Sequence, residues 1–325
     1  MTMDTIDKHI VAIDLGTSKI ALTVAKVEGN DVQIIYYKET ESAGIRYSSV
    51  FNVKNVTEAL ASAIALAEDE LNIKITQAVV GMPKYPIKKV TANAELDGRG
   101  EDTDITEEDI DSLKSFAQDS YPLEDPEKEA IFGAVAQSFS DGENFQIIEN
   151  DIIGMTSDVL EGNFKIFIGK KSPLAKIATV LKKAGIVAAR KYFTADTTAK
   201  AVLLDSEMEN GVALIDFGGG CTSVAIYHGN IMRHYASIPF GGKNITSDIK
   251  SECQISEKLA GGNRTEVLDV AEIIMMAYEL PVALEVMEFH IGIFQKFFHN
   301  HFFCHFFSPG RTYDTLATRI YFPFK

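Results

Sequence analysis

Alternating apolar and polar residues near the start of the chain predict three strands, over residues 9–14, 19–27 and 31–39. A Gly29-Asn30 turn is expected to join the second strand to the third. Apolar residues at helical spacing then predict a helix over residues 55–71, which is followed by a strand over residues 77–82. Strands and helices that alternate in this way predict an α/β fold.

A more acidic segment, residues 84–169, interrupts this pattern. Within it Thr106 is predicted to cap a helix that ends near residue 117, because its hydroxyl can accept from free amides of the first turn and acidic residues follow it. Short strands are expected over residues 132–139 and 164–169. The segment is interpreted as an inserted subdomain, and a decorated loop region is the alternative.

Two further helices are predicted after this segment. Ser172 as N-cap, Pro173 at the first helical position and Gly185 as the stop predict the first of them. The second is expected over residues 194–204.

The candidate chemistry lies in two glycine-rich turns of the same design, IDLGTSK at residues 13–19 and IDFGGGCT at residues 215–222. Each follows an apolar strand that ends in aspartate. A glycine turn lets backbone amides approach an anion, and an aspartate at a strand end can hold a hydrated magnesium ion. One such turn is equally well a tight hairpin. Two turns, about 200 residues apart, predict two related domains that hold one nucleotide between them.

Two other segments carry a resemblance to a known family. IIGMTSDVLE at residues 152–161 and SIPFGGKNITSDI at residues 237–249, together with the glycine turns, resemble the FtsA family of bacterial cell-division proteins, within the actin/Hsp70/sugar-kinase superfamily. The resemblance covers residues 10–260. It implies an actin-like ATPase (ribonuclease H-like) fold with an inserted FtsA-type subdomain and an incomplete second domain.

The resemblance also implies a division of the chain into five parts. These are the first part of domain I (residues 1–83), an inserted FtsA-type or SHS2 subdomain (84–169), the remainder of domain I with a crossing helix (170–210), the start of domain II with the second phosphate loop (211–260), and a divergent, poorly folded tail (261–325).

ATP and Mg²⁺ are the ligands that the resemblance implies. Asp14 and Asp216 would bind magnesium through water, and Lys19 would add positive charge to the phosphate site. The residues expected to contact phosphate are Gly16, Thr17, Ser18, Lys19, Gly218, Gly219, Gly220 and Thr222. Binding is expected to be weak, because Gly261-Gly262-Asn263 breaks the helix that forms one wall of the adenosine pocket in the family.

The crossing helix departs from the family pattern. Thr194 stands where relatives carry a glutamate that orients the attacking water, and Asp196 is the nearby candidate for a catalytic base. Efficient hydrolysis needs a positioned base, so the sequence predicts slow ATP hydrolysis at most.

The charge of the chain restricts its possible partners, and its cysteine content indicates its cellular compartment. With 31 Lys plus Arg against 46 Asp plus Glu, the net charge of −15 argues against nucleic acid as a partner. Three widely spaced cysteines and an N-terminus without an apolar stretch predict a reducing, cytoplasmic compartment. By resemblance the partners are FtsZ, other division proteins and further copies of the chain, at the inner face of the cell membrane.

The character of the chain changes after residue 260. Residues 289–325 hold 10 of the 20 phenylalanines and 4 of the 7 histidines. The favoured interpretation is a truncated or frame-disrupted end in which a membrane-anchoring helix is not evident. A zinc site formed by residues 299–305 and a membrane-surface helix are the alternatives.

The function that the resemblance implies is that of an ATP-binding, filament-forming adaptor that links the FtsZ ring to the membrane and recruits division proteins. Two other functions compete with it. A phosphotransferase of the same superfamily, such as a sugar or acetate kinase, would need a substrate pocket with a catalytic carboxylate between the domains. A non-catalytic interaction module would need only the first domain and its insert to fold.

Overall fold

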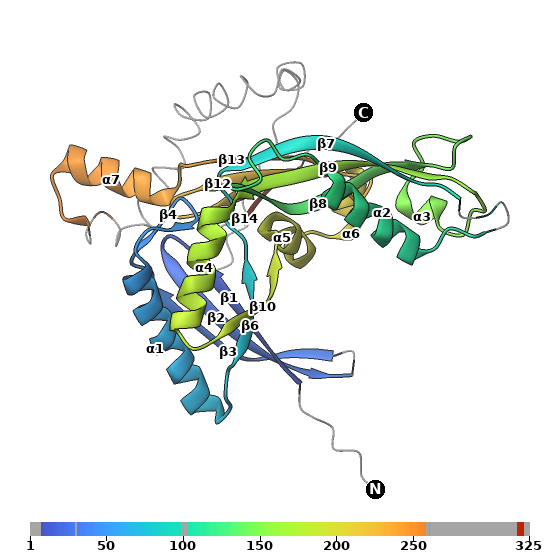
Figure 1. Cartoon of the computed structure of the whole chain (residues 1–325). Coiled ribbons are helices and arrows are strands. Elements are labelled where there is room, and N and C mark those ends of the chain that lie inside the picture. Colours follow the sequence, from blue (N-terminus) through green and yellow to red (C-terminus); the bar gives the residue numbers. More distant parts are fainter. Residues whose placement is uncertain are drawn as a thin grey trace, which may run out of the picture. The chain divides into compact units, whose positions relative to one another are not determined.

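The computed structural model describes residues 8–257 apart from residues 30, 99, 101 and 102, together with residues 260 and 317–321 (Figure 1). The chain divides into two compact units. The first comprises residues 1–240 and 313–325, and the second comprises residues 241–312. Both glycine-rich turns belong to the first unit.

A five-stranded sheet begins the first unit, in the order β10-β6-β1-β2-β3 (Figure 1). Its strands are β1 (Lys8–Leu15), β2 (Lys19–Glu28), β3 (Asp31–Glu41), β6 (Gln77–Gly81) and β10 (Val187–Tyr192). β1, β2 and β3 run antiparallel, whereas β6 runs parallel to both β1 and β10. The three strands predicted at the start of the chain are confirmed.

Two helices that pack together bury the apolar side of this sheet, α1 (Val53–Leu71) and α4 (Lys171–Lys183). Leu60 of α1 and Val180 of α4 belong to one buried cluster with Leu22 of β2. Burying a side chain of this size contributes about 2 kcal/mol, so the cluster is what holds the helices to the sheet.

The start of α4 differs from the prediction. Lys170 is the N-cap residue and makes no side-chain capping bond, so Ser172 is not the cap. The helix follows β9 without a loop, and its first turn therefore begins before Ser172. Pro173 is tolerated as the third residue of the helix, because first-turn amides have no partner within the helix. The predicted stop is confirmed, since Gly185 takes a left-handed φ of 86° just beyond the helix.

A short hairpin lies between β3 and α1 in the chain. It pairs β4 (Ile45–Arg46) with β5 (Ser49–Val50). The two residues between these strands, Tyr47 and Ser48, have φ values of 48° and 61°. Two consecutive positive φ values are typical of the tight turn that matches the twist of a hairpin. This turn places the Ser48 hydroxyl beside the functional site described below.

The acidic segment forms a three-stranded antiparallel sheet in the order β7-β9-β8 (Figure 1). Its elements are β7 (Ile87–Leu96), α2 (Glu107–Ser120), β8 (Glu129–Ser140), α3 (Glu149–Ile152) and β9 (Leu160–Lys170). The Thr106 cap is confirmed. Its hydroxyl accepts from the Asp109 amide at 3.2 Å, and the Asp109 carboxylate accepts from the Thr106 amide at 2.8 Å.

This sheet takes part in two apolar clusters. On one side Leu113 of α2 packs in a cluster with Leu160 and Phe164 of β9. The other cluster contains Phe167 of β9, which stacks on Phe193 with ring centroids 4.8 Å apart. This cluster also includes residues of a further sheet, which contains residues 212–238. The first cluster is internal to the segment and the second is shared. The division of the chain at residues 84 and 169 stays a prediction.

A second sheet repeats the start of the first. Its order is β13-β12-β11-β14, and β11, β12 and β13 run antiparallel as β1, β2 and β3 do. The strands are β11 (Val212–Phe217), β12 (Thr222–His228), β13 (Ile231–Ile238) and β14 (Ala317–Tyr321). The helices α5 (Thr194–Val202) and α6 (Asp205–Asn210) lie between the two sheets in the chain.

Little of the predicted tail lies within the described residues. β14 pairs antiparallel with β11 and is the described part of residues 261–325. The zinc and membrane-surface alternatives at residues 299–305 fall outside the described residues.

The second unit contributes one described helix, α7 (Gly242–Cys253). Its start is closed by the Gly241 amide, which donates to the side-chain oxygen of Asn244 at 3.0 Å. Gln254, at a φ of 52°, follows its last residue. No helix among the described residues of either unit is long and apolar enough to cross a membrane.

Candidate functional site

The two glycine-rich turns have the same construction. In each, four residues separate the last paired residues of the hairpin, between Leu15 and Ile20 in one and between Phe217 and Thr222 in the other. The first glycine amide of each turn donates to the carbonyl three residues later at 3.0 Å, from Gly16 to Lys19 and from Gly218 to Cys221. We call these turns the first tip (residues 16–19) and the second tip (residues 218–221).

Both tips need glycine at their first position for the same reason. A Cβ atom on Gly16 would lie 2.7 Å from the Lys19 carbonyl oxygen, and one on Gly218 would lie 2.8 Å from the Cys221 carbonyl oxygen. These distances are shorter than a carbon–oxygen contact allows, and backbone atoms cannot step aside as a flexible side chain can. The glycines by which the tips are recognised in the sequence are therefore required by the geometry of the tips.

The fold brings the two tips into direct contact. A Cβ atom on Gly219 would lie 2.0 Å from the Ser18 hydroxyl oxygen, and one on Gly220 would lie 2.8 Å from a methyl carbon of Thr17. Residues about 200 positions apart in the chain are thus neighbours. Of the residues predicted to contact phosphate, these four lie together.

Ser18 carries an unsatisfied polar atom at this contact. Its hydroxyl oxygen is buried and has no hydrogen-bond partner among the described residues. A buried hydroxyl without a partner costs about 1–3 kcal/mol, and such groups are rare in folded proteins. An oxygen-bearing ligand at the tips would supply the missing partner.

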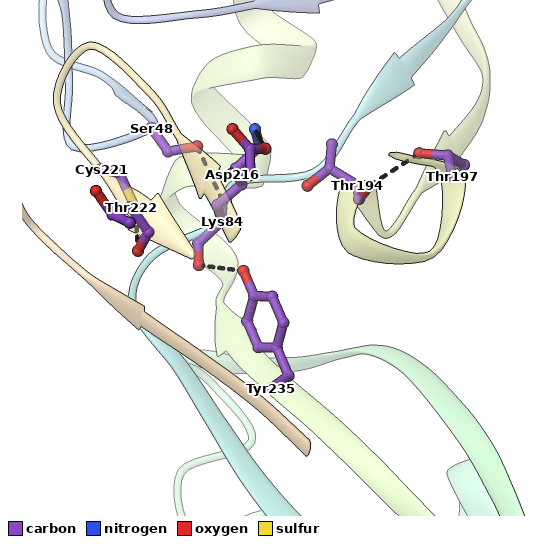
Figure 2. Close-up of polar contacts among 8 residues, drawn as sticks. All are labelled: Ser48, Lys84, Thr194, Thr197, Asp216, Cys221, Thr222 and Tyr235. Carbon is purple, nitrogen blue, oxygen red and sulfur yellow. Dashed lines mark hydrogen bonds and ion pairs between the residues drawn. The ribbon is translucent and has the colours of Figure 1, made fainter. Parts of the chain in front are cut away.

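Lys84, which sequence reasoning missed, lies beside the tips (Figure 2). Its ammonium group makes an ion pair and hydrogen bond with the Asp216 carboxylate. Only 22% of the Lys84 side chain and 11% of the Asp216 side chain are exposed. The pair is thus largely screened from water, which strengthens the attraction between its charges.

The backbone of Lys84 is fixed from two other directions. Its amide donates to the Ser48 hydroxyl at 2.9 Å, and its carbonyl accepts from the Tyr235 hydroxyl at 3.0 Å (Figure 2). The lysine is therefore held by the β4–β5 turn and by β13 as well as by Asp216. Its place in the chain could have indicated it, since ligands bind beyond the carboxyl ends of parallel strands and Lys84 follows β6 closely.

Asp14 and Asp216 are the penultimate residues of equivalent strands and act on the same lysine. The surrounding protein desolvates Asp14 and raises its pKa; Lys84 opposes this rise, and the negative charge of Asp216 adds to it. Burial alone would lower the pKa of Lys84, but Asp216 and then Asp14 outweigh it, so the pKa of Lys84 is raised. The site thus keeps its lysine charged.

Two predicted phosphate contacts already have other partners. The Lys19 ammonium binds the Glu39 carboxylate on β3 at 2.6 Å. The Thr222 hydroxyl donates to the Phe240 carbonyl at 2.7 Å. Their predicted roles would require these bonds to be exchanged for bonds to phosphate.

Asp196 is paired within its own helix. Its carboxylate lies 3.2 Å from the Lys200 ammonium, one helical turn further along α5, and its side chain is 43% exposed. Thr194, the other residue singled out on this helix, has a buried hydroxyl with no partner among the described residues, while its carbonyl accepts from Thr197 at 3.1 Å (Figure 2). The catalytic role of Asp196 stays a prediction.

Cys221 is not suited to act as a nucleophile, and the described part of the chain holds no clustered metal site. Cys221 is buried, and burial raises the pKa of its thiol to about 12, so the thiol stays protonated. No group of three or more His, Cys, Asp or Glu side chains in the described residues is arranged to hold a metal ion.

The fold is shared with solved structures of low sequence similarity. A chain of the PilM-PilN type IV pilus biogenesis complex superposes with a TM-score of 0.57 at 15% identity, covering 88% of this chain and 77% of that one. The ethanolamine utilization protein EutJ from Carboxydothermus hydrogenoformans gives 0.50 at 14% identity, covering 86% and 72%. The protein has an actin-like ATPase fold.

Sequence similarity is more specific than the fold. The model of the family "Cell division protein FtsA" matches residues 213–266. The chain is 26% identical to FtsA of Neisseria meningitidis serogroup B over 277 residues, which are 85% of this chain and 63% of the relative. It is 28% identical to FtsA of Enterococcus hirae over 241 residues, which are 74% and 53%. The chain is FtsA-like, and it spans between half and two thirds of the length of these relatives.

Proposed function

We propose that this chain is a cell-division protein that binds ATP at the two tips. The observation that carries the proposal is the contact between two glycine turns of one design, each after a strand whose penultimate residue is aspartate. Amides at a glycine tip can approach an anion closely, and two facing tips can hold one phosphate chain from both sides. The partnerless Ser18 hydroxyl supports a ligand at the same place.

Phosphate would enter by separating the tips. A phosphate group cannot fit where the side chains of Thr17 and Ser18 already touch Gly219 and Gly220. Binding would therefore exchange the contact between the tips for contacts with the ligand. If the tips separate when nucleotide binds, the two sheets that carry them would change position relative to one another.

The expected Mg²⁺ ion fits this arrangement poorly. Asp14 and Asp216 are predicted to bind magnesium through water, but the Lys84 ammonium already binds the Asp216 carboxylate. Magnesium requires near-octahedral oxygen ligands, so an ion at Asp216 would have to compete with the Lys84 ammonium for the carboxylate oxygens. Lys84 is thus the positive charge that the fold itself places at the site.

Hydrolysis at this site would be slow. An attacking water needs a positioned base, and the nearest carboxylate of α5, that of Asp196, is paired with Lys200. Thr194, in the place where relatives carry glutamate, cannot take up a proton from water at neutral pH. The nucleotide is therefore proposed to control assembly of the protein with its partners, and rapid ATP hydrolysis is not part of the proposed role.

The proposed partners follow from the FtsA relatives. They are FtsZ, other division proteins and further copies of the chain, with the protein located in the cytoplasm and peripherally at the inner face of the membrane. Binding of FtsZ polymers, measured by co-sedimentation with purified FtsZ, tests this part. A chain that stays in the supernatant at all FtsZ concentrations would contradict it.

Calorimetric titration of the full chain with ATP tests the nucleotide site. We expect an affinity in the high micromolar range, about −5 to −6 kcal/mol, carried mainly by phosphate contacts. Gly219→Ala should abolish binding because a methyl group on the second tip would keep its amides from approaching the phosphate closely. Gly133→Ala is the matched control, since the nearest atom to its Cβ would lie at 3.9 Å. The site assignment fails if both variants bind ATP like the unmodified chain.

A further inference from the structure

Three charged side chains lie together at the tips, and their combination of charges is unusual for a site expected to bind a metal ion. Asp14 and Asp216 supply two negative charges, and Lys84 supplies one positive charge that is bonded to Asp216. Of the ion pairs found among the described residues, this one has the lowest exposure for its two partners taken together, at 22% and 11%. A divalent cation bound directly by Asp216 would have to compete with this ammonium for the carboxylate oxygens.

We propose that Lys84 is the resident cation of the phosphate site, in the position where Mg²⁺ would act, so that nucleotide binds here with little dependence on magnesium. This inference rests on the proposed nucleotide site. It assigns to Lys84 a positioning role towards the phosphate groups.

The geometry restricts how far Lys84 can withdraw. Its backbone is tied to Ser48 on one side and to Tyr235 on the other, so the stem of the side chain starts from a fixed point. Moving the ammonium away would leave the buried Asp216 carboxylate without its partner, which costs several kcal/mol. An incoming Mg²⁺ ion would replace the ammonium at Asp216, but Lys84 would then be a buried cation without its counter-charge, and this cost would oppose the exchange.

The ammonium also has bonds left to offer. It carries three N–H donors, and Asp216 accepts from it. A phosphate oxygen that entered between the separated tips could accept from another donor. Lys84 could then neutralise phosphate charge directly while keeping its bond to Asp216.

The other lysine at the tips does not compete for this role. Lys19 is bonded to Glu39 on β3, and that carboxylate also accepts from the Tyr37 hydroxyl. Tyr37 and Lys19 together lower the pKa of Glu39 against the opposing effect of burial. Glu39 therefore stays charged and holds the Lys19 ammonium in its own ion pair, and Lys19 is the weakest of the influences on the pKa of Asp14.

Calorimetric titration of the full chain with ATP, in excess Mg²⁺ and in EDTA, is the experiment. We expect the dissociation constant of the unmodified chain to change by less than about threefold. In Lys84→Met the carboxylates lose their cation, and ATP affinity should become dependent on Mg²⁺ by about tenfold or more. Lys84→Gln, which keeps an uncharged donor, should behave as Lys84→Met does.

The matched control is Lys88→Met, four residues further along and bonded to the exposed Glu124. It should leave both affinities unchanged. The inference is overturned if the unmodified chain loses more than about threefold in affinity in EDTA, or if Lys84→Met stays independent of magnesium. No ATP binding under either condition would overturn the proposed function and this inference with it. If the variants do not fold, the unmodified chain alone decides between these outcomes.

Discussion

Lysine side chains in two regions of the first unit meet opposite electrostatic environments. At the tips, Lys84 faces two carboxylates and its pKa is raised. Where β7, β9 and β13 meet, Lys89, Lys165, Arg233 and His234 form a group that we call the cationic cluster. None of the ion pairs found among the described residues involves a member of this cluster.

The members of the cationic cluster bind one another or backbone carbonyls. The Lys89 ammonium lies 2.7 Å from Nδ1 of His234, and the Lys165 ammonium donates to the Arg233 carbonyl. Burial, Lys89 and Arg233 lower the pKa of Lys165 to about 8, and burial, Lys89 and Lys165 lower that of His234 to about 4. A net charge of −15 therefore says little about any one site. Local partners decide whether a lysine is held charged or driven towards its neutral form.

Removing the charge of Lys84, which two carboxylates compensate, should have the largest effect on stability. Lys84→Met leaves Asp216 buried without a counter-charge, and we expect the free energy of unfolding to fall by about 3 kcal/mol at pH 7. Urea denaturation followed by circular dichroism measures the change. Lys88→Met, at an exposed ion pair, should stay within about 0.5 kcal/mol of the unmodified chain. Equal losses in the two variants would remove the distinction between the regions.

Disturbing the contact between the tips should come next. Gly219→Ala places a methyl group 2.0 Å from the Ser18 hydroxyl oxygen, so the tips must shift, at a cost of about 2 kcal/mol. Gly133→Ala has room for its methyl group and should cost less than about 1 kcal/mol. Thermal unfolding of the two variants in parallel is the measurement. A Gly219→Ala chain as stable as Gly133→Ala would mean that the tips do not touch in solution.

A smaller effect, seen in its pH dependence, is expected for Lys165. Its folded pKa of about 8 lies below the value of 10.5 in the unfolded chain. Between these values the unfolded chain binds a proton that the folded chain has lost, so stability should rise with pH across this window. Allowing for solvent screening at a half-exposed site, the rise is about 1 kcal/mol. Unfolding at pH 7.5 and pH 10 should show it in the unmodified chain and not in Lys165→Met.

The smallest effect is expected for His234. Its folded pKa of about 4 lies below the usual 6.5, so the unfolded chain binds more protons between these values and stability falls as pH falls through them. The imidazolium can relieve part of this cost by turning away from Lys89, which leaves about 0.5 kcal/mol. His234→Gln should reduce the loss between pH 6.5 and pH 4. An unchanged slope would show that the ring is not surrounded by cations in solution.

Local signals in the sequence predicted much of the fold. The three strands at the start of the chain, helix α1 and the Thr106 cap each depend on residues within a few positions of one another. The predicted Ser172 cap failed because β9 runs directly into α4, and that junction is fixed by sheet pairing. β7 was missed because its sequence, IKKVTANAEL, has few large apolar residues in alternation.

The candidate site was predicted only in part. The glycines and aspartates of the tips follow from the chemistry of turns, and Thr17, Ser18, Gly219 and Gly220 do lie together. Lys84 could not be found in the same way, because its partner Asp216 is 132 positions away and only the fold joins them. Nor does the sequence say that Lys19 binds Glu39, since several acidic residues lie within its reach.

The shared construction of the two tips also bears on how such a chain can change over generations. Leu15 pairs with Ile20 and Phe217 with Thr222, with four residues between the members of each pair, although the two hairpins differ in most residues. Side chains alternate between the faces of a strand, so inserting or deleting one codon before Asp14 or Asp216 would turn that carboxylate to the opposite face. Point substitutions can accumulate along these strands while their length cannot drift. The two hairpins thus share the number of residues in their tips more than the identity of those residues.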